Sequence, residues 1–340
     1  MANAQELKPL WKHSAGEYIT AIEWSPDGTC FAAAQAEGPI LLLSERGKVL
    51  RELPGHAMGT NALAWSPDGD VLATGGQDKK ARLLNPKSGE TVAEFLPGGA
   101  SVEKFTWQPG SPILASASGK HLRLWDAKGQ PAGEFPDQKF SIADMQWRTD
   151  GKYLATANFE GVRLWEPGVA TAMLTYENQL PILALAWNAT HEWIVCGTQE
   201  ASLLIWNTKS GEDFQAGPYM TKVRELSWDY RGRYLVTGGG VDLSLWDFNK
   251  DNLQGLRPTF LRGHKDPVSQ VHFQHVGPTL ASAGKDGMAF FWKPEISKDP
   301  IATCPGREEV SKIAWHPKDR SLAIARADGA IELWPTPGRA

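Results

Sequence analysis

"WSPDGTCFAAA", residues 24–34, has the pattern of two β-strands joined by a tight turn. Trp24 ends one run of alternating apolar residues, and a second apolar run begins after the turn. Pro26 and Gly28 suit the turn, because proline presets φ and glycine accepts the backbone conformation that such turns require. The stretch returns as "WSPDGDVLATG" from Trp65, so the chain contains a repeated unit.

Aligning the chain on itself gives eight copies of this unit. The first aromatic residues of the copies are Trp24, Trp65, Trp107, Trp147, Trp187, Trp228, Phe273 and Trp315. Successive aromatics are separated by 41, 42, 40, 40, 41, 45 and 42 residues. An apolar residue stands two places before each aromatic, which is the alternation of a β-strand. Each copy therefore begins with a strand.

Each copy continues with further short strands. A turn and a second apolar strand follow the aromatic, as in "YLATA" (153–157), and a third strand comes next, as in "LRLW" (122–125). Weaker fourth strands are predicted at 48–53, 91–96, 130–135, 171–176, 212–216, 258–262 and 300–304. The last copy ends at Trp334 without a fourth strand of its own.

Two kinds of dipeptide mark several copies. Asp126 and Asp247 complete Trp-Asp pairs, and Gly-His pairs stand at 55–56 and 263–264. Together with a period of about 40 residues, these features resemble the WD-repeat family of β-propellers. The resemblance implies an all-β fold, an eight-bladed β-propeller of four-stranded antiparallel blades, as a single domain over residues 1–340.

The N-terminus carries a spare strand, "LKPLWKHS" (7–14). We expect residues 7–14 to complete the last blade and close the ring, which removes the exposed edges of an open array. The blades are predicted to begin near residues 18, 60, 102, 142, 182, 223, 268 and 310. Residues 247–258 account for the interval of 45 and are predicted to form a longer loop, which the family resemblance would place on the bottom face.

Composition narrows the possible partners. The net charge is −4 and no run of Lys or Arg occurs, which disfavours nucleic acid. Cys30, Cys196 and Cys304 are far apart and odd in number, which indicates reduced thiols in a reducing compartment. No stretch approaches the ~20 apolar residues of a membrane span, and the N-terminus has no apolar leader. These features predict a soluble, cytoplasmic, monomeric ring that does not bind membranes.

The seventh copy contains a set of residues that suggests two readings. His264, Ser282, Asp286 and Trp292 match the complete tetrad of the WD-repeat family, which implies a buried hydrogen-bond chain between strands. The alternative is a hydrolase site. No Gly-x-Ser-x-Gly turn surrounds Ser282, so we interpret the four residues as structural and predict no catalytic residues.

The other copies match the tetrad less well. The second has His56, Thr74 and Asp78, but Leu84 replaces the tryptophan. The eighth keeps its Asp and Trp but has "GR" in place of Gly-His, and the remaining copies depart further. We expect these blades to depend more on packing.

No cofactor or metal is predicted. Three histidines lie in "GHKDPVSQVHFQH" (263–275), but the strand and turn pattern separates them and no cysteine is near. The glycine-rich segments "TGGG" (237–240) and "TGGQDKK" (74–80) do not match a phosphate-binding loop and do not lead into a helix.

The resemblance implies docking on the narrow top face, which is built from the loops entering each blade and the turns between second and third strands. Seven apolar side chains occupy such positions: Tyr18, Met58, Phe140, Phe159, Leu180, Tyr219 and Met220. Aromatic residues and Met are favoured at the centres of protein interfaces. The charges around them are mixed, which fits a protein partner better than nucleic acid. The sequence thus predicts a non-enzymatic protein–protein interaction scaffold.

The alternative function is small-ligand or metal-ion binding in the central channel. Charged first-strand residues are expected to face that channel: Glu103, Lys104, Asp144, Arg224, Glu225 and Lys312.

Overall fold

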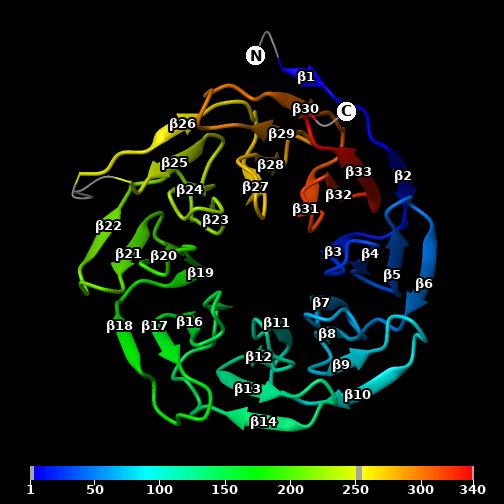
Figure 1. The fold of residues 1–340 in the computed structure, drawn as a ribbon, viewed down its shortest axis with the longest axis vertical. Coiled ribbons are helices and arrows are strands. Elements are labelled where there is room, and N and C mark those ends of the chain that lie inside the picture. The colour runs from blue at the N-terminus through cyan, green and yellow to red at the C-terminus, as the bar shows by residue number, and fades with distance from the viewer. Residues whose placement is uncertain (1–3, 250–254, 339–340) are drawn as a thin grey trace. The chain divides into compact units, whose positions relative to one another are not determined.

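A computed structural model describes residues 4–249 and 255–338 (Figure 1). Every secondary-structure element in these ranges is a β-strand, so they contain no helix that could cross a membrane. The strands form eight sheets, each built on four antiparallel strands, which is the fold of an eight-bladed β-propeller. In seven sheets these four strands are consecutive in the chain, and in the eighth the N-terminal β2 joins the last three strands. The middle of the predicted loop 247–258, residues 250–254, lies outside the described residues.

One compact unit runs from Ser14 to Gln179 and contains blades one to four. Its strands are, in blade one, β3 (Ile19–Trp24), β4 (Cys30–Gln35), β5 (Ile40–Ser44) and β6 (Val49–Leu53); in blade two, β7 (Thr60–Trp65), β8 (Leu72–Gly76), β9 (Ala81–Leu84) and β10 (Thr91–Phe95); in blade three, β11 (Val102–Trp107), β12 (Leu114–Ser118), β13 (His121–Trp125) and β14 (Pro131–Glu134); and in blade four, β15 (Asp144–Trp147), β16 (Leu154–Asn158), β17 (Gly161–Trp165) and β18 (Leu174–Glu177).

The second unit contains the rest of the described chain, with blades five to eight. Its strands are, in blade five, β19 (Ile182–Trp187), β20 (Trp193–Thr198), β21 (Leu203–Asn207) and β22 (Asp213–Ala216); in blade six, β23 (Leu226–Trp228), β24 (Tyr234–Thr237), β25 (Leu243–Asp247) and β26 (Thr259–Leu261); in blade seven, β27 (Val268–Phe273), β28 (Leu280–Gly284), β29 (Ala289–Trp292) and β30 (Ala302–Cys304); and in blade eight, β31 (Val310–Trp315), β32 (Ser321–Arg326) and β33 (Ala330–Pro335).

The N-terminal segment supplies two strands to this second unit. β2 (Trp11–Ser14) pairs with β33 and is the fourth strand of blade eight, as predicted. The predicted strand over residues 7–14 is nevertheless too long, because residues 7–10 are not in a strand. Pro9 lacks the N–H that a paired strand needs. β1 (Gln5–Glu6), which the sequence did not indicate, pairs in parallel with β30 as a fifth strand on blade seven.

The recurring tryptophan links neighbouring blades within each unit. The indole Nε1–H of Trp65 donates to the carbonyl oxygen of Glu23 at 3.1 Å, and that of Trp107 donates to the carbonyl oxygen of Ala64 at 3.0 Å. Trp147, Trp228 and Trp315 bond the preceding blade in the same way. Because each indole also packs its rings in the interior, one side chain both fills the space between blades and satisfies a strand carbonyl.

Candidate functional site

Blade seven brings its four predicted tetrad residues together. His264 Nε2 lies 2.9 Å from Ser282 Oγ, and His264 Nδ1 lies 3.1 Å from both carboxylate oxygens of Asp286. Trp292 Nε1 donates to Ser282 Oγ at 2.9 Å. His264, Ser282 and Trp292 are buried, so Ser282 does not face solvent as an exposed nucleophile would. The chain of contacts joins the loop before the blade to its second and third strands.

The direction of these hydrogen bonds follows from their chemistry. Trp292 can only donate, so the Ser282 hydroxyl accepts from it and is free to donate to His264 Nε2. A neutral imidazole then carries its proton on Nδ1 and donates to Asp286. Burial of Asp286 opposes ionisation, but the bonds from His264 and from the Lys265 N–H outweigh it and lower the pKa of that carboxyl.

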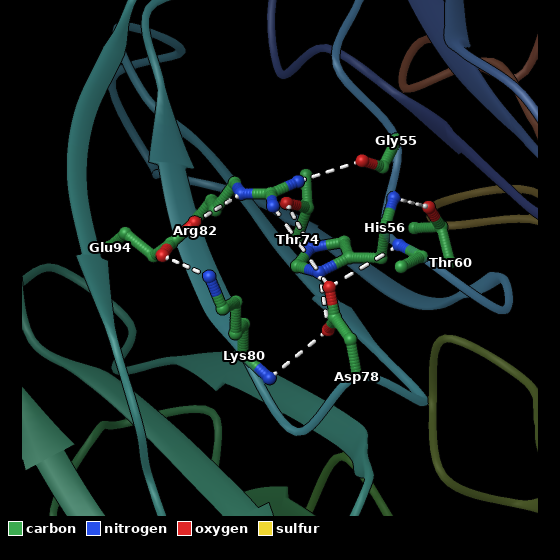
Figure 2. Close-up of polar contacts among 9 residues, drawn as sticks. Gly55, His56, Thr60, Thr74, Asp78, Lys80, Arg82 and Glu94 are labelled. Atoms are coloured by element: carbon green, nitrogen blue, oxygen red, sulfur yellow. Dashed lines mark hydrogen bonds and ion pairs between the residues drawn. The ribbon is translucent and has the colours of Figure 1, made fainter.

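Blade two forms the same chain without its tryptophan (Figure 2). His56 Nδ1 lies 2.9 Å from Asp78 Oδ1, and His56 Nε2 lies 2.9 Å from Thr74 Oγ1. The His56 backbone N–H donates to Thr60 Oγ1 at 3.1 Å. Burial lowers the pKa of the His56 imidazole below its ordinary value, although Asp78 opposes this effect. The ring is therefore held as a neutral hydrogen-bonding group rather than as a cation.

A charged cluster lies beside this chain in blade two. Arg82 Nη1 donates to the carbonyl oxygen of Gly55 at 2.7 Å, and Arg82 Nε donates to Glu94 Oε2 at 2.8 Å. Lys80 Nζ bonds the other oxygen of Glu94 at 2.6 Å, so both cations share one carboxylate, as Figure 2 shows. Arg82 lies on the third strand and thus holds Gly55, the residue before His56. In blade seven the third strand supplies the tryptophan instead.

Blade four contains a further chain with glutamine in place of histidine. Gln138 Nε2 donates to Thr156 Oγ1 at 3.0 Å, and Trp165 Nε1 donates to the same hydroxyl at 2.9 Å. Asn158 Nδ2 donates to Gln138 Oε1 at 2.7 Å, so an amide stands where blade seven has a carboxylate. All of these polar groups are buried and satisfied.

Blade six uses tyrosine for the same purpose. The hydroxyl oxygens of Tyr219 and Thr237 lie 2.8 Å apart, and Trp246 Nε1 donates to the Tyr219 hydroxyl at 2.9 Å. Burial raises the pKa of Tyr219 to about 12. The phenol therefore stays protonated and serves as a donor and an acceptor inside the blade.

Blade eight replaces the tetrad with a buried ion pair. Arg326 Nη2 lies 2.9 Å from Glu332 Oε2, and both side chains are almost fully buried. Trp334 Nε1 donates to the same carboxylate oxygen at 3.1 Å, and Lys12 Nζ of the N-terminal strand lies 2.7 Å from Oε1. Burial opposes ionisation of Glu332, but the bonds from Arg326 and Lys12 outweigh it and lower the pKa of this carboxyl. Three donors thus satisfy one buried carboxylate.

Two of the seven predicted docking residues meet on blade four. The ring centroids of Phe140 and Phe159 lie 5.1 Å apart, and Lys139 Nζ lies 5.2 Å from the Phe140 centroid. Both rings line a cavity of about 510 Å³ together with Lys139, Glu160 and Arg163. Glu160 lies 2.6 Å from Arg163 Nη2 and 3.0 Å from Lys139 Nζ. An aromatic pair therefore stands beside a hollow bordered by paired charges.

The other predicted docking residues do not line this cavity. Tyr18, Met58 and Met220 are exposed, and Leu180 is half-buried. Tyr219 lies next to Met220 in sequence, but its hydroxyl faces the interior of blade six. Tyr219 and Met220 line a second cavity, which lies between blades five and six.

The predicted channel residues belong to both units: Glu103, Lys104 and Asp144 to one, and Arg224, Glu225 and Lys312 to the other. Lys104 Nζ lies 3.0 Å from Asp144 Oδ1, so these two charges compensate each other. In the other unit, burial raises the pKa of Glu225 to about 7. Across residues 4–249 and 255–338, no three His, Cys, Asp or Glu side chains are placed to hold a metal ion.

A protein-family model matches part of this repeat pattern. The family model "WD domain, G-beta repeat" matches residues 47–85, 90–126 and 256–293. The chain therefore contains WD repeats over these three segments. The three matched segments fall on blades one to three and on blades six and seven, which include both of the blades that carry the histidine chain.

Several known proteins are similar to this chain. Actin-interacting protein 1 of Drosophila melanogaster is 34% identical over 116 residues, which are 32% of this chain and 19% of that protein. THO complex subunit 3 of Arabidopsis thaliana is 27% identical over 309 residues, which are 82% of this chain and 90% of that protein. Anaphase-promoting complex subunit cdh1 of Dictyostelium discoideum is 27% identical over 306 residues, which are 86% of this chain and 38% of that protein. The chain spans most of the plant protein but less than half of the other two.

A solved structure has the same fold. The crystal structure of the computationally designed Ika8 protein aligns with a TM-score of 0.82 and 18% sequence identity, over 98% of this chain and 100% of that one. This likeness concerns the fold alone.

Sequence reasoning missed the polar chains of blades four, six and eight. A signal for two of them was present: Gln138 precedes Thr156 by 18 residues, and Tyr219 precedes Thr237 by 18. The same separation joins His56 to Thr74 in blade two. In these blades glutamine, tyrosine and arginine supply hydrogen bonds in place of histidine, so a poor match to the tetrad does not mean that the polar chain is missing. That these blades depend more on packing stays a prediction.

Proposed function

We propose that this protein is a non-enzymatic scaffold and that the Phe140–Phe159 pair on blade four is the centre of its docking surface. The observation that carries the proposal is the contact of two partly exposed aromatic rings beside a cavity of about 510 Å³. Aromatic anchors next to pockets supply much of the energy of protein interfaces. Lys139, Glu160 and Arg163 form a charged border around the rings, as expected for the rim of such a surface.

The comparisons support an interaction role. Two similar proteins are named as subunits of complexes, THO complex subunit 3 and anaphase-promoting complex subunit cdh1. A role in assembling proteins rather than in catalysis also agrees with the buried position of Ser282. The alternative function, ligand binding in the central channel, makes the opposite prediction about which residues matter.

The proposal is tested with the double variant Phe140→Ala, Phe159→Ala. The tagged full-length protein is used to capture partners from its native cells, and the captured proteins are quantified by mass spectrometry. We expect the variant to lose its main partner by about tenfold or more. The matched variant Lys104→Ala, Arg224→Ala should keep that partner. Loss of binding in the channel variant with retention in the aromatic variant would reject the proposal in favour of the channel.

Tyr219 is unsuitable for this test although the sequence placed it among the docking residues. Its hydroxyl bonds Thr237 and Trp246 inside blade six, so truncation would leave two buried groups without a partner. A loss of binding in a Tyr219 variant would therefore mix docking with stability.

A further inference from the structure

A second hollow of the molecule lies within one unit, between blades five and six. This groove has a volume of about 870 Å³. Trp246 and Tyr219 form part of its lining, and Phe214 of β22 lines it from blade five. Met220 and Phe260 also line it, with exposed fractions of 86% and 49%. Large apolar side chains therefore line the groove, from the buried Trp246 at one extreme to the exposed Met220 at the other.

The groove lies beside outer strands. β22 is the last strand of the blade-five sheet and β26 is the last strand of the blade-six sheet, and residues of both line the groove. An outermost strand keeps one row of backbone N–H and C=O groups available to an added strand. The groove thus offers both apolar contacts and backbone hydrogen bonds to an extended segment.

The equivalent position on blade seven shows how such a segment is bound. There β1 adds to the outer strand β30, with the Gln5 N–H donating to the Ile301 carbonyl at 3.0 Å and the Leu7 N–H to the Thr303 carbonyl at 2.9 Å. Leu7 is buried in the core cluster that blades seven and eight share, which includes Trp334. Trp246 is the last residue but one of the third strand of blade six, as Trp334 is in blade eight, and it lines the groove. In the chain itself, an acidic residue, Glu6, directly precedes the buried leucine.

The charges at the groove favour an acidic segment. Arg257, Arg262 and Asp242 line it. Arg262 Nε lies 3.2 Å from Asp242 Oδ2, so these two charges compensate each other. Arg257 is exposed and has no carboxylate partner within the described ranges, which leaves one positive charge at the groove. A carboxylate on the bound segment would complement it.

We propose that the groove between blades five and six binds an extended segment of a protein partner, in which a large apolar side chain stands next to a carboxylate. The apolar side chain enters beside Trp246, the backbone adds to β22, and the carboxylate faces Arg257. This site is separate from the Phe140–Phe159 surface, and the proposal does not depend on that surface.

Two pools of fluorescein-labelled heptapeptides test the proposal by fluorescence anisotropy with the full chain. Both pools have Leu or Phe at the centre, and the flanking positions are Glu in one pool and Lys in the other. We expect the Glu pool to bind and the Lys pool to bind at least about tenfold more weakly. Met220→Glu should weaken binding of the Glu pool about tenfold or more. Arg257→Glu should reverse the preference between the pools.

The control for Met220→Glu is Met173→Glu, because Met173 is also exposed but does not line the groove. It should bind the Glu pool like the unchanged protein, as should Phe140→Ala, Phe159→Ala. Thermal melting checks that each variant is folded. The proposal is overturned if neither pool binds, if Met220→Glu binds as well as Met173→Glu, or if sedimentation shows that a second copy of the chain occupies the groove and excludes the peptides.

Discussion

Glu23 is a half-buried acidic residue, and the fold loses stability when its carboxyl ionises. Its Oε2 atom is buried and has no hydrogen-bond partner within the described part of the chain, and burial raises the pKa of its carboxyl from 4.5 to about 8. Between these two values the folded protein holds a proton that the unfolded chain has released. The free energy of unfolding contributed by this group therefore falls as the pH rises from 4.5 towards 8.

Replacing Glu23 by glutamine should remove this dependence. We expect Glu23→Gln to be more stable than the unchanged protein at a pH above that pKa of about 8 and to differ less from it near 4.5. Denaturant unfolding across this pH range measures the difference. Glu37→Gln is the control, because Glu37 is exposed. A Glu23→Gln curve parallel to that of the unchanged protein would show that the carboxyl is not desolvated.

At the scale of the strand and blade, the ion pair of blade eight requires a glycine. A Cβ atom on Gly306 would lie 2.0 Å from Cζ of Arg326. The guanidinium has little room to move, because it pairs with Glu332 and donates to the Gly287 carbonyl at 2.7 Å. Gly306 thus stands where blades two and seven have the glycine of a Gly-His pair, and here it makes room for an arginine from the second strand.

Gly306→Ala should therefore destabilise blade eight. Displacing Arg326 would leave Glu332 as a buried carboxylate without its main partner, which we expect to cost about 3 kcal/mol or more. Gly99→Ala is the matched control, because nothing lies within 4 Å of a Cβ at that position. Denaturant unfolding of both variants measures the difference, and equal stability of the two would show that Arg326 is not held as described.

The elements also show what the sequence could predict and what it could not. The strands were predictable because apolar residues alternate and the unit recurs eight times, so the pattern in each copy supports the strands predicted in the other copies. The polar chains were predictable only where the residue type was kept, as at His56 and His264. Gln138 and Tyr219 offer equivalent donors and acceptors, and a comparison by residue type does not detect that equivalence. Phe140 and Phe159 were both predicted as docking residues, but their contact and the cavity beside them depend on backbone positions that no local pattern specifies.

At the scale of the whole molecule, the N-terminal segment stabilises two blades that lie at the other end of the sequence. Leu7 packs in the core cluster that blades seven and eight share, and β2 supplies the fourth strand of blade eight. Lys12 also pairs with Glu332 at 2.7 Å. Because the two contributions come from successive pieces of the segment, successive truncations separate them.

Truncation should lower the free energy of unfolding in two steps. Removing residues 1–10 deletes β1 and Leu7, and burial of a leucine contributes about 2 kcal/mol. Removing residues 1–14 also deletes β2, which exposes the edge of β33 and takes away the Lys12 partner of Glu332, so the second loss should be larger than the first. Thermal melting gives the order, and hydrogen exchange should show that β33 amides lose protection only in the longer deletion. If the longer deletion melts like the full chain, the N-terminal strand does not hold blade eight.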